Sequence, residues 1–191
     1  CITLVKDTDH NLPLTEKQRS AYLVYVQSTP TTKAYSGDPV KKVVIEELEA
    51  AGFHVDVCPN FHDLEAEQGP HWSHMVKMMS HDSREEFKKK YDVVFLVINV
   101  KGYAQENWVR LRWSCNHSCE LPWYNSEVPT VGISLNYTNH MIDVPQLHTF
   151  INAYAPERMH IRACIEKICG KSEFKGIANE LVWGGRWETR L

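Results

Sequence analysis

The sequence lacks long hydrophobic runs and an excess of charge of one sign. Its longest purely apolar run, Val93–Ile98, has six residues, whereas a membrane-spanning helix needs about 20. The 21 Lys and Arg residues nearly balance the 24 Asp and Glu residues, which leaves a net charge of −3. Bulk electrostatics therefore gives the chain no reason to bind nucleic acid or an anionic membrane. We expect no nucleic-acid partner and no membrane span.

The sequence also lacks the local motifs of self-contained enzymes. It has neither a Gly-x-Ser-x-Gly nucleophile elbow nor a glycine-rich phosphate loop. Cys58 follows a predicted strand, but Pro59 lacks the backbone N–H that an oxyanion hole normally takes from the next residue. We therefore predict no catalytic residue and no cofactor in this chain.

Cysteine is too sparse for a small disulfide scaffold, since six cysteines are spread over 191 residues. Cys164 and Cys169 are five positions apart in a predicted helix, so they point to different faces. Free thiols in a reducing compartment are the preferred interpretation. We accordingly predict a cytoplasmic protein, with a secreted or cell-wall-associated location as the alternative.

Two clusters contain residue types that bind metals. One is Cys115, His117 and Cys119, and the other is His71, His74 and His81. A structural zinc site needs four ligands at a suitable spacing, and neither cluster supplies them. We therefore predict no metal site and interpret both clusters as surface or loop residues.

Apolar strand-like runs alternate with helix-like stretches along the chain, which is typical of an α/β domain with a mostly parallel sheet. The predicted strands are Tyr22–Val26, Phe53–Val57, Val93–Val100, Thr130–Leu135 and Leu147–Ile151. The predicted helices cover 38–52 and 84–91, with a third that opens at Pro156 and ends at Gly170. Four or five strands separated by helices predict a flavodoxin-like three-layer α/β/α sandwich.

The charged residues of two segments suggest solvated faces. Glu46, Glu47 and Glu49 lie opposite the apolar stripe of the 38–52 helix, which indicates a face in water. Arg110 and Arg112 alternate with apolar residues, as in an amphipathic edge strand. An anion-binding role for these two arginines is the less favoured alternative.

Four segments together resemble a known family. They are residues 2–14 (ITLVKDTDHNLPL), 128–137 (VPTVGISLNY), 143–154 (beginning DVP and ending INAY) and 174–176 (FKG). In this order they resemble the C-terminal domain of glycoside hydrolase family 3, and the bacterial β-N-acetylhexosaminidase branch in particular. The chain departs from the glucosidase branch because it lacks that branch's closing Asn-Pro-Ser-Gly-Arg-Leu-Pro type of segment.

The resemblance implies that the catalytic aspartate lies on an N-terminal (β/α)₈ barrel of the same polypeptide, which is absent from this chain. It implies a carbohydrate substrate with a β-linked N-acetylglucosamine. It also implies one domain over 1–191, with a lead-in at 1–20, a sandwich at 21–170 and a tail at 171–191. Loops at the carboxyl ends of the strands would reach the active-site rim, and Lys101, Glu106 and Asn136 are the rim candidates.

Two alternatives from other functional classes remain open. One is a stand-alone flavodoxin-like module that binds a small ligand or nucleotide. The other is an interaction module, whose contact surface would include Trp183 and Trp187 if both were exposed.

Overall fold

The computed structural model describes residues 2–27, 38–61, 63–64, 73, 76, 82–101, 110–111, 113–114 and 120–185. The strands are β1 (Thr3–Asp7), β2 (Ser20–Gln27), β3 (His54–Val57), β4 (Val93–Asn99), β5 (Thr130–Ser134) and β6 (Thr149–Asn152). The helices are α1 (Pro39–Ala50), α4 (Arg84–Lys90) and α5 (Arg158–Ile168). Short 3₁₀ turns are η1 (Trp123–Ser126), η2 (His140–Asp143) and η3 (Glu180–Trp183). None of the described helices is long and apolar enough to cross a membrane.

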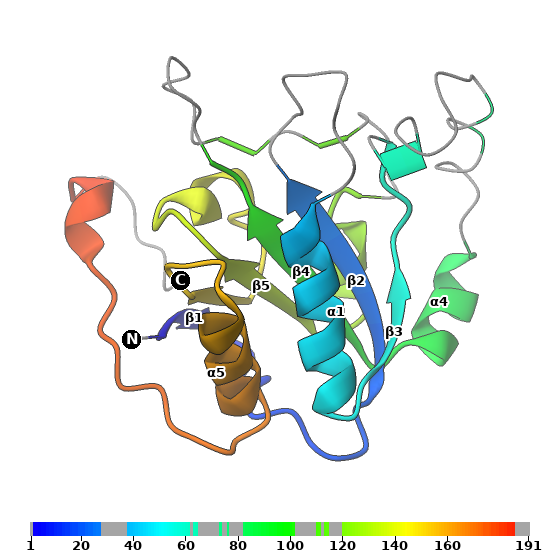
Figure 1. Cartoon of the computed structure of the whole chain (residues 1–191), viewed down its shortest axis with the longest axis horizontal. Helices are drawn as coiled ribbons and strands as arrows, with labels where there is room; N and C mark the ends of the chain where they lie inside the picture. Colours follow the sequence, from blue (N-terminus) through cyan, green and yellow to red (C-terminus); the bar gives the residue numbers. More distant parts are fainter. Residues whose placement is uncertain are drawn as a thin grey trace.

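The strands form one six-stranded sheet in the order β1-β6-β5-β4-β2-β3 (Figure 1). The strands β2 to β6 pair in parallel, and β1 pairs with β6 antiparallel. If β1 is set aside, the order is that of flavodoxin, as expected. The strand β1 was not predicted. Because it lies at residues 3–7, the predicted lead-in at 1–20 contributes a strand to the sheet.

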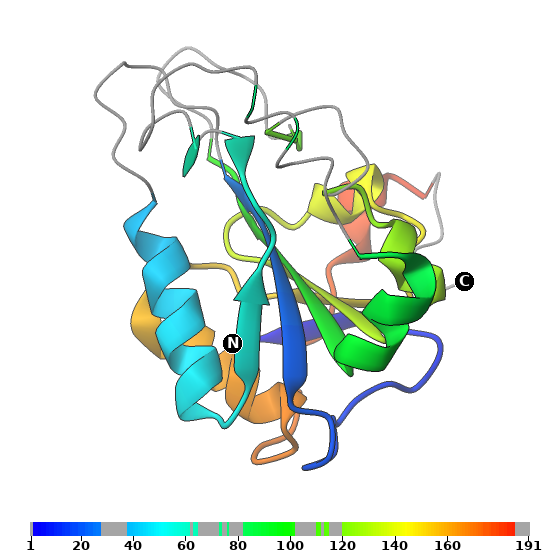
Figure 2. The same ribbon diagram turned by 90° about the vertical axis from the view of Figure 1, so that its right-hand side faces the viewer.

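Helices cover both faces of the sheet and complete the three layers (Figure 2). Alternate residues of β4 point to opposite faces, so Phe95 and Val97 join the apolar cluster beneath α1 and α5. Leu96 and Ile98 join the cluster that contains Phe87 of α4. All seven residues of β4 are buried, as expected for a central parallel strand. The predicted fold class is confirmed.

The helices begin where the sequence places side-chain caps. Asp38 caps α1 through the backbone N–H of Val40, and Pro39 occupies the first helical position. Ser83 and Glu86 form a reciprocal capping box at the start of α4. The third helix, α5, begins at Arg158, two residues after the predicted opening at Pro156.

Two expectations about side-chain placement are wrong. Glu47 is buried between α1 and α5 instead of lying in water, although Glu49 is exposed as predicted. Arg110 lies in a bend, where its guanidinium binds the carboxylate of Asp143, and the described residues 110, 111 and 113 are not in a strand. Arg112 lies outside the described residues. Of the two tryptophans of the interaction alternative, Trp183 is buried in the core on the α4 face, and Trp187 lies outside the described residues.

Candidate functional site

The sheet has a topological switch point between β2 and β4. The chain passes from β2 outward to β3, and then returns to build β4, β5 and β6 on the other side of β2. Ligands of open α/β sheets bind in the crevice at the carboxyl ends of the strands that flank such a point. Two polar residues end these strands, since Gln27 of β2 and Asn99 of β4 are paired in register.

Asp38 is the centre of the polar network at this edge. Its Oδ2 atom accepts hydrogen bonds from the Tyr25 hydroxyl (2.9 Å) and from Nδ2 of Asn99 (2.8 Å). Its Oδ1 atom accepts the backbone N–H of Val40 at 2.9 Å, which is the helix cap. The Asp38 carboxylate therefore joins β2, β4 and the N-terminus of α1, and the positive end of the helix dipole favours its negative charge.

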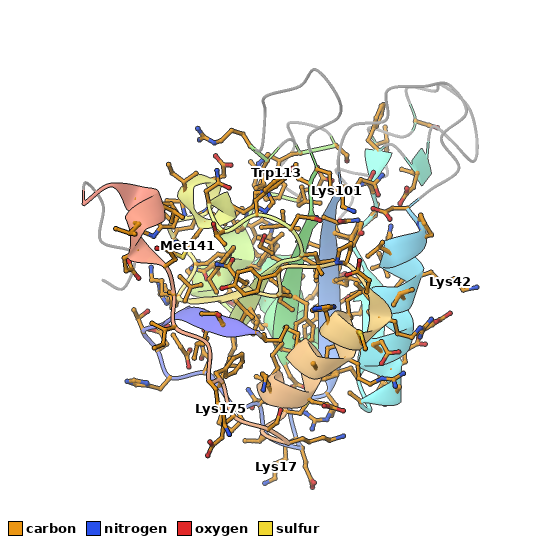
Figure 3. The ribbon with its side chains drawn as sticks, turned by 60° about the vertical axis from the view of Figure 1, so that its left-hand side comes forward. Lys17, Lys42, Lys101, Trp113, Met141 and Lys175 are labelled. Atoms are coloured by element: carbon orange, nitrogen blue, oxygen red, sulfur yellow. The ribbon has the colours of Figure 1, made fainter. Side chains whose placement is uncertain are left out.

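The structure brings one of the three rim candidates into this network. Asn136 donates a hydrogen bond from its Nδ2 to Oδ1 of Asn99 at 2.7 Å. Lys101 follows β4 and is exposed at the same end of the sheet, where Figure 3 labels it near Trp113. Glu106 lies outside the described residues. The two candidates that can be placed thus lie at the predicted edge.

A second group of polar contacts surrounds the start of α1. The Lys41 ammonium pairs with Oδ2 of Asp63 at 2.6 Å. Asn60 donates from Nδ2 to the backbone oxygen of Tyr25 at 3.4 Å. These contacts tie the loop after β3 to β2 and α1, so they hold that loop at the carboxyl edge of the sheet.

The contacts at this edge leave both polar atoms of the Gln27 side chain unexplained, whereas Asp63 and Asn152 each lack a partner for one oxygen only in the described part of the chain. The side chain of Gln27 is 3% exposed. Among the described residues, no group hydrogen-bonds to its amide nitrogen or its amide oxygen. A buried polar group without a partner costs about 1–3 kcal/mol, so it requires an explanation.

A buried serine–histidine pair lies on the opposite face of the sheet, at the end of β5. Ser134 Oγ is 2.7 Å from Nδ1 of His140 and 2.7 Å from the backbone oxygen of Tyr137. The carbonyl can only accept, so the single hydroxyl proton of Ser134 goes to Tyr137, and the serine accepts from His140. In this geometry His140 cannot act as the base that activates the serine, and the pair is a structural brace.

Glu47 forms a second buried carboxylate site, between α1 and α5. Its Oε2 accepts from Nε of Arg162 (2.8 Å), and its Oε1 accepts from Arg158 (2.7 Å) and Arg162 (3.0 Å). The hydrogen bonds from Arg162 and Arg158 lower the pKa of Glu47 to about 2, although burial acts in the opposite direction. Both oxygens are occupied by charged donors, so this group is held for stability.

The sequence and the fold of this chain are both similar to those of known proteins. A β-N-acetylglucosaminidase/β-glucosidase from Cellulomonas fimi is 27% identical over 194 residues, which is 100% of this chain and 32% of that protein. The solved structure of the β-glucoside phosphorylase BglX is 27% identical with a TM-score of 0.70, and the match covers 93% of this chain and 29% of that one. No family model matches the chain.

The chain is similar to part of glycoside hydrolase family 3 enzymes and resembles their C-terminal domain. A family 3 β-N-acetylglucosaminidase from Paenibacillus sp. shares the fold at 14% identity, with a TM-score of 0.54 and coverage of 93% of this chain and 30% of that one. The chain thus spans about a third of the length of these relatives. The resemblance to the family 3 C-terminal domain, stated from four sequence segments, is confirmed.

Sequence reasoning missed the residues that define the edge of this family 3-like domain. Asp38 was recognised only as a helix cap, and Gln27 and Asn99 were not singled out. The available signal was a polar residue at the end of each of two strands that are apolar over most of their length. Both candidate metal clusters, at 71–81 and 115–119, lie outside the described residues.

Proposed function

We propose that this chain is the C-terminal domain of a larger enzyme that cleaves β-glycosides, with β-linked N-acetylglucosamine as the preferred sugar. Its partner is a catalytic (β/α)₈ barrel of the same polypeptide. One observation carries the proposal: the whole chain aligns with about a third of a β-N-acetylglucosaminidase/β-glucosidase. The remaining two thirds of that relative leave room for the barrel.

The chemistry of the carboxyl edge supports a role in sugar contact without bond cleavage. Retaining glycoside hydrolysis uses two carboxyl groups about 5–5.5 Å apart, one of which attacks the sugar. Asp38 accepts three hydrogen bonds, and Asp63 is paired with Lys41. Neither carboxylate is therefore a free nucleophile among the described residues of this edge, which supports reacting groups on the other domain.

Turnover assays test this proposal. The purified 191-residue chain and the full-length product of its gene are each given p-nitrophenyl β-N-acetylglucosaminide and p-nitrophenyl β-glucoside. Because two of the related structures are β-glucoside phosphorylases, each assay is run with and without inorganic phosphate. We expect turnover by the full-length product and only background release by the chain alone. Comparable turnover by the chain alone would contradict the proposal.

A stand-alone small-ligand module is the second candidate, and the flavodoxin order of β2 to β6 favours it. It predicts that a flavin or a nucleotide raises the melting temperature of the chain. The absence of any shift across both ligand classes would remove this candidate. The cytoplasmic location stays a prediction from the sequence.

A further inference from the structure

We propose that the amide of Gln27 binds an uncharged ligand that offers a neighbouring hydrogen-bond donor and acceptor, such as a sugar hydroxyl pair or an acetamido group. The sugar class rests on the proposed function, whereas the site itself rests on the geometry of this chain. The proposal assigns ligand contact to a residue that the sequence analysis did not select.

The position of Gln27 follows from strand register. Tyr25 and Gln27 are two residues apart on β2, so both point to the face that α1 covers, with Gln27 about 7 Å nearer the carboxyl end. The Tyr25 hydroxyl reaches the α1 cap at Asp38. Gln27 lies beside Asn99, its partner in register, and Asn99 also contacts Asp38. The unpartnered amide is therefore held next to the N-terminal end of α1.

The neighbouring groups select a neutral ligand. An anion would meet the Asp38 carboxylate, which already caps the positive end of the α1 dipole. A cation would find both oxygens of that carboxylate accepting hydrogen bonds. The side chains next to Gln27 in the network, Asn99 and Asn136, are neutral amides. An amide that offers one N–H and one C=O matches a ligand with the complementary pair.

An amide without a partner does not stabilise the fold, so its replacement separates stability from binding. Methionine has nearly the same length and no strong hydrogen-bonding group. We expect Gln27→Met to raise the melting temperature of the free chain by about 2–4 °C, because a buried unsatisfied group is removed. Gln146→Met makes the same chemical change at an exposed glutamine and should shift the melting temperature by less than about 1 °C.

Binding is measured on the same 191-residue chains with N-acetylglucosamine, glucose and, as a control, glycerol. The wild-type chain should show a saturable shift of the Gln27 side-chain NH₂ signals in ¹⁵N NMR titrations with at least one of the two sugars. Gln27→Met should weaken that affinity at least tenfold, and Gln146→Met should leave it unchanged.

Three results would overturn the inference. A loss of stability in Gln27→Met would show that a protein group already satisfies the amide. No saturable shift of the wild-type signals, or a shift with glycerol equal to that with the sugars, would exclude a sugar site in this chain. Because binding is read from the chain alone, these results are independent of turnover by the full-length product. Turnover without binding therefore removes only the inference, and binding without turnover removes only the proposed function.

Discussion

The two ends of α1 hold two carboxylates in opposite ways. Near its C-terminal end, Glu47 is bound by the guanidinium groups of Arg158 and Arg162 from α5. At its N-terminal end, Asp38 is bound by neutral donors from β2 and β4 and by the helix backbone. Charged donors occupy both oxygens of Glu47. Asp38 instead contacts Asn99, which lies beside the unpartnered amide of Gln27. One helix thus carries a charged clamp at one end and a network of neutral hydrogen bonds at the other.

Removal of Glu47 should have the largest effect on stability. Glu47→Ala leaves Arg158 and Arg162 without their shared partner and removes a contact between α1 and α5. Loss of one partner of a buried pair costs about 3–5 kcal/mol, but both arginines are half-exposed and can be hydrated, so we expect about 2–3 kcal/mol. Urea unfolding measures the change as a lower midpoint at constant slope.

Glu49→Ala is the matched control for this clamp, because Glu49 lies on the same helix and is exposed. Its effect should stay within about 0.5 kcal/mol. Equal losses in the two variants would show that Glu47 is no more important than a surface carboxylate, and the contrast between the ends of α1 would fail.

Acid should weaken the contacts of Glu47 with Arg158 and Arg162. The pKa of Glu47 is lowered to about 2 in the folded chain, from an ordinary value of 4.5. A carboxyl with a lowered folded pKa stabilises the fold above its unfolded pKa, and this contribution is lost as the pH falls through the folded value. Stability should therefore decline between about pH 4.5 and pH 2. Glu47→Gln should flatten this decline in chemical unfolding followed across pH, and an unchanged slope would exclude Glu47 as its source.

Removal of Asp38 should have an intermediate effect. Asp38→Ala deletes a helix cap, which costs about 1 kcal/mol, and leaves the Tyr25 hydroxyl and the Asn99 amide without their acceptor. We expect a loss of about 2 kcal/mol in urea unfolding. Ser83→Ala removes the cap of α4 alone and should cost about 1 kcal/mol. If the two variants lose the same stability, Asp38 is only a cap and the network adds nothing.

The sequence predicted the fold well because its signals were local. The apolar run at 93–98, the cap at Asp38 and the apolar stripe of the 38–52 helix each act within a few positions. The strand β1 escaped prediction because its stability comes from β6, some 145 residues away, and because it contains a buried lysine, Lys6. A five-residue edge strand with polar members has no periodicity strong enough to identify it.

The candidate site was only partly predictable, because its contacts join distant parts of the chain. The place of Asn136 at the carboxyl edge of the sheet followed from strand ends, but its hydrogen bond to Asn99 spans 37 positions. Helical periodicity placed Glu47 among solvated glutamates, and only the docking of α5 against α1 explains its burial. Pairings of this kind depend on tertiary packing, about which a single sequence contains no local signal.

The smallest expected effect on stability comes from replacement of Asn136. This variant best separates a role in ligand binding from a purely structural role. Asn136→Ala removes one neutral hydrogen bond of 2.7 Å to Asn99, which is worth about 1 kcal/mol. Asn125→Ala removes a bond of equal length, from Asn125 to the backbone of Gln146, at an exposed site. Urea unfolding should show losses of at most about 1 kcal/mol for both variants. Affinity for N-acetylglucosamine should fall in Asn136→Ala alone, because Asn136 holds the side chain of Asn99, and Asn99 lies beside Gln27. Equal affinity in both variants would show that Asn136 has a structural role only, and would contradict its predicted place on the rim.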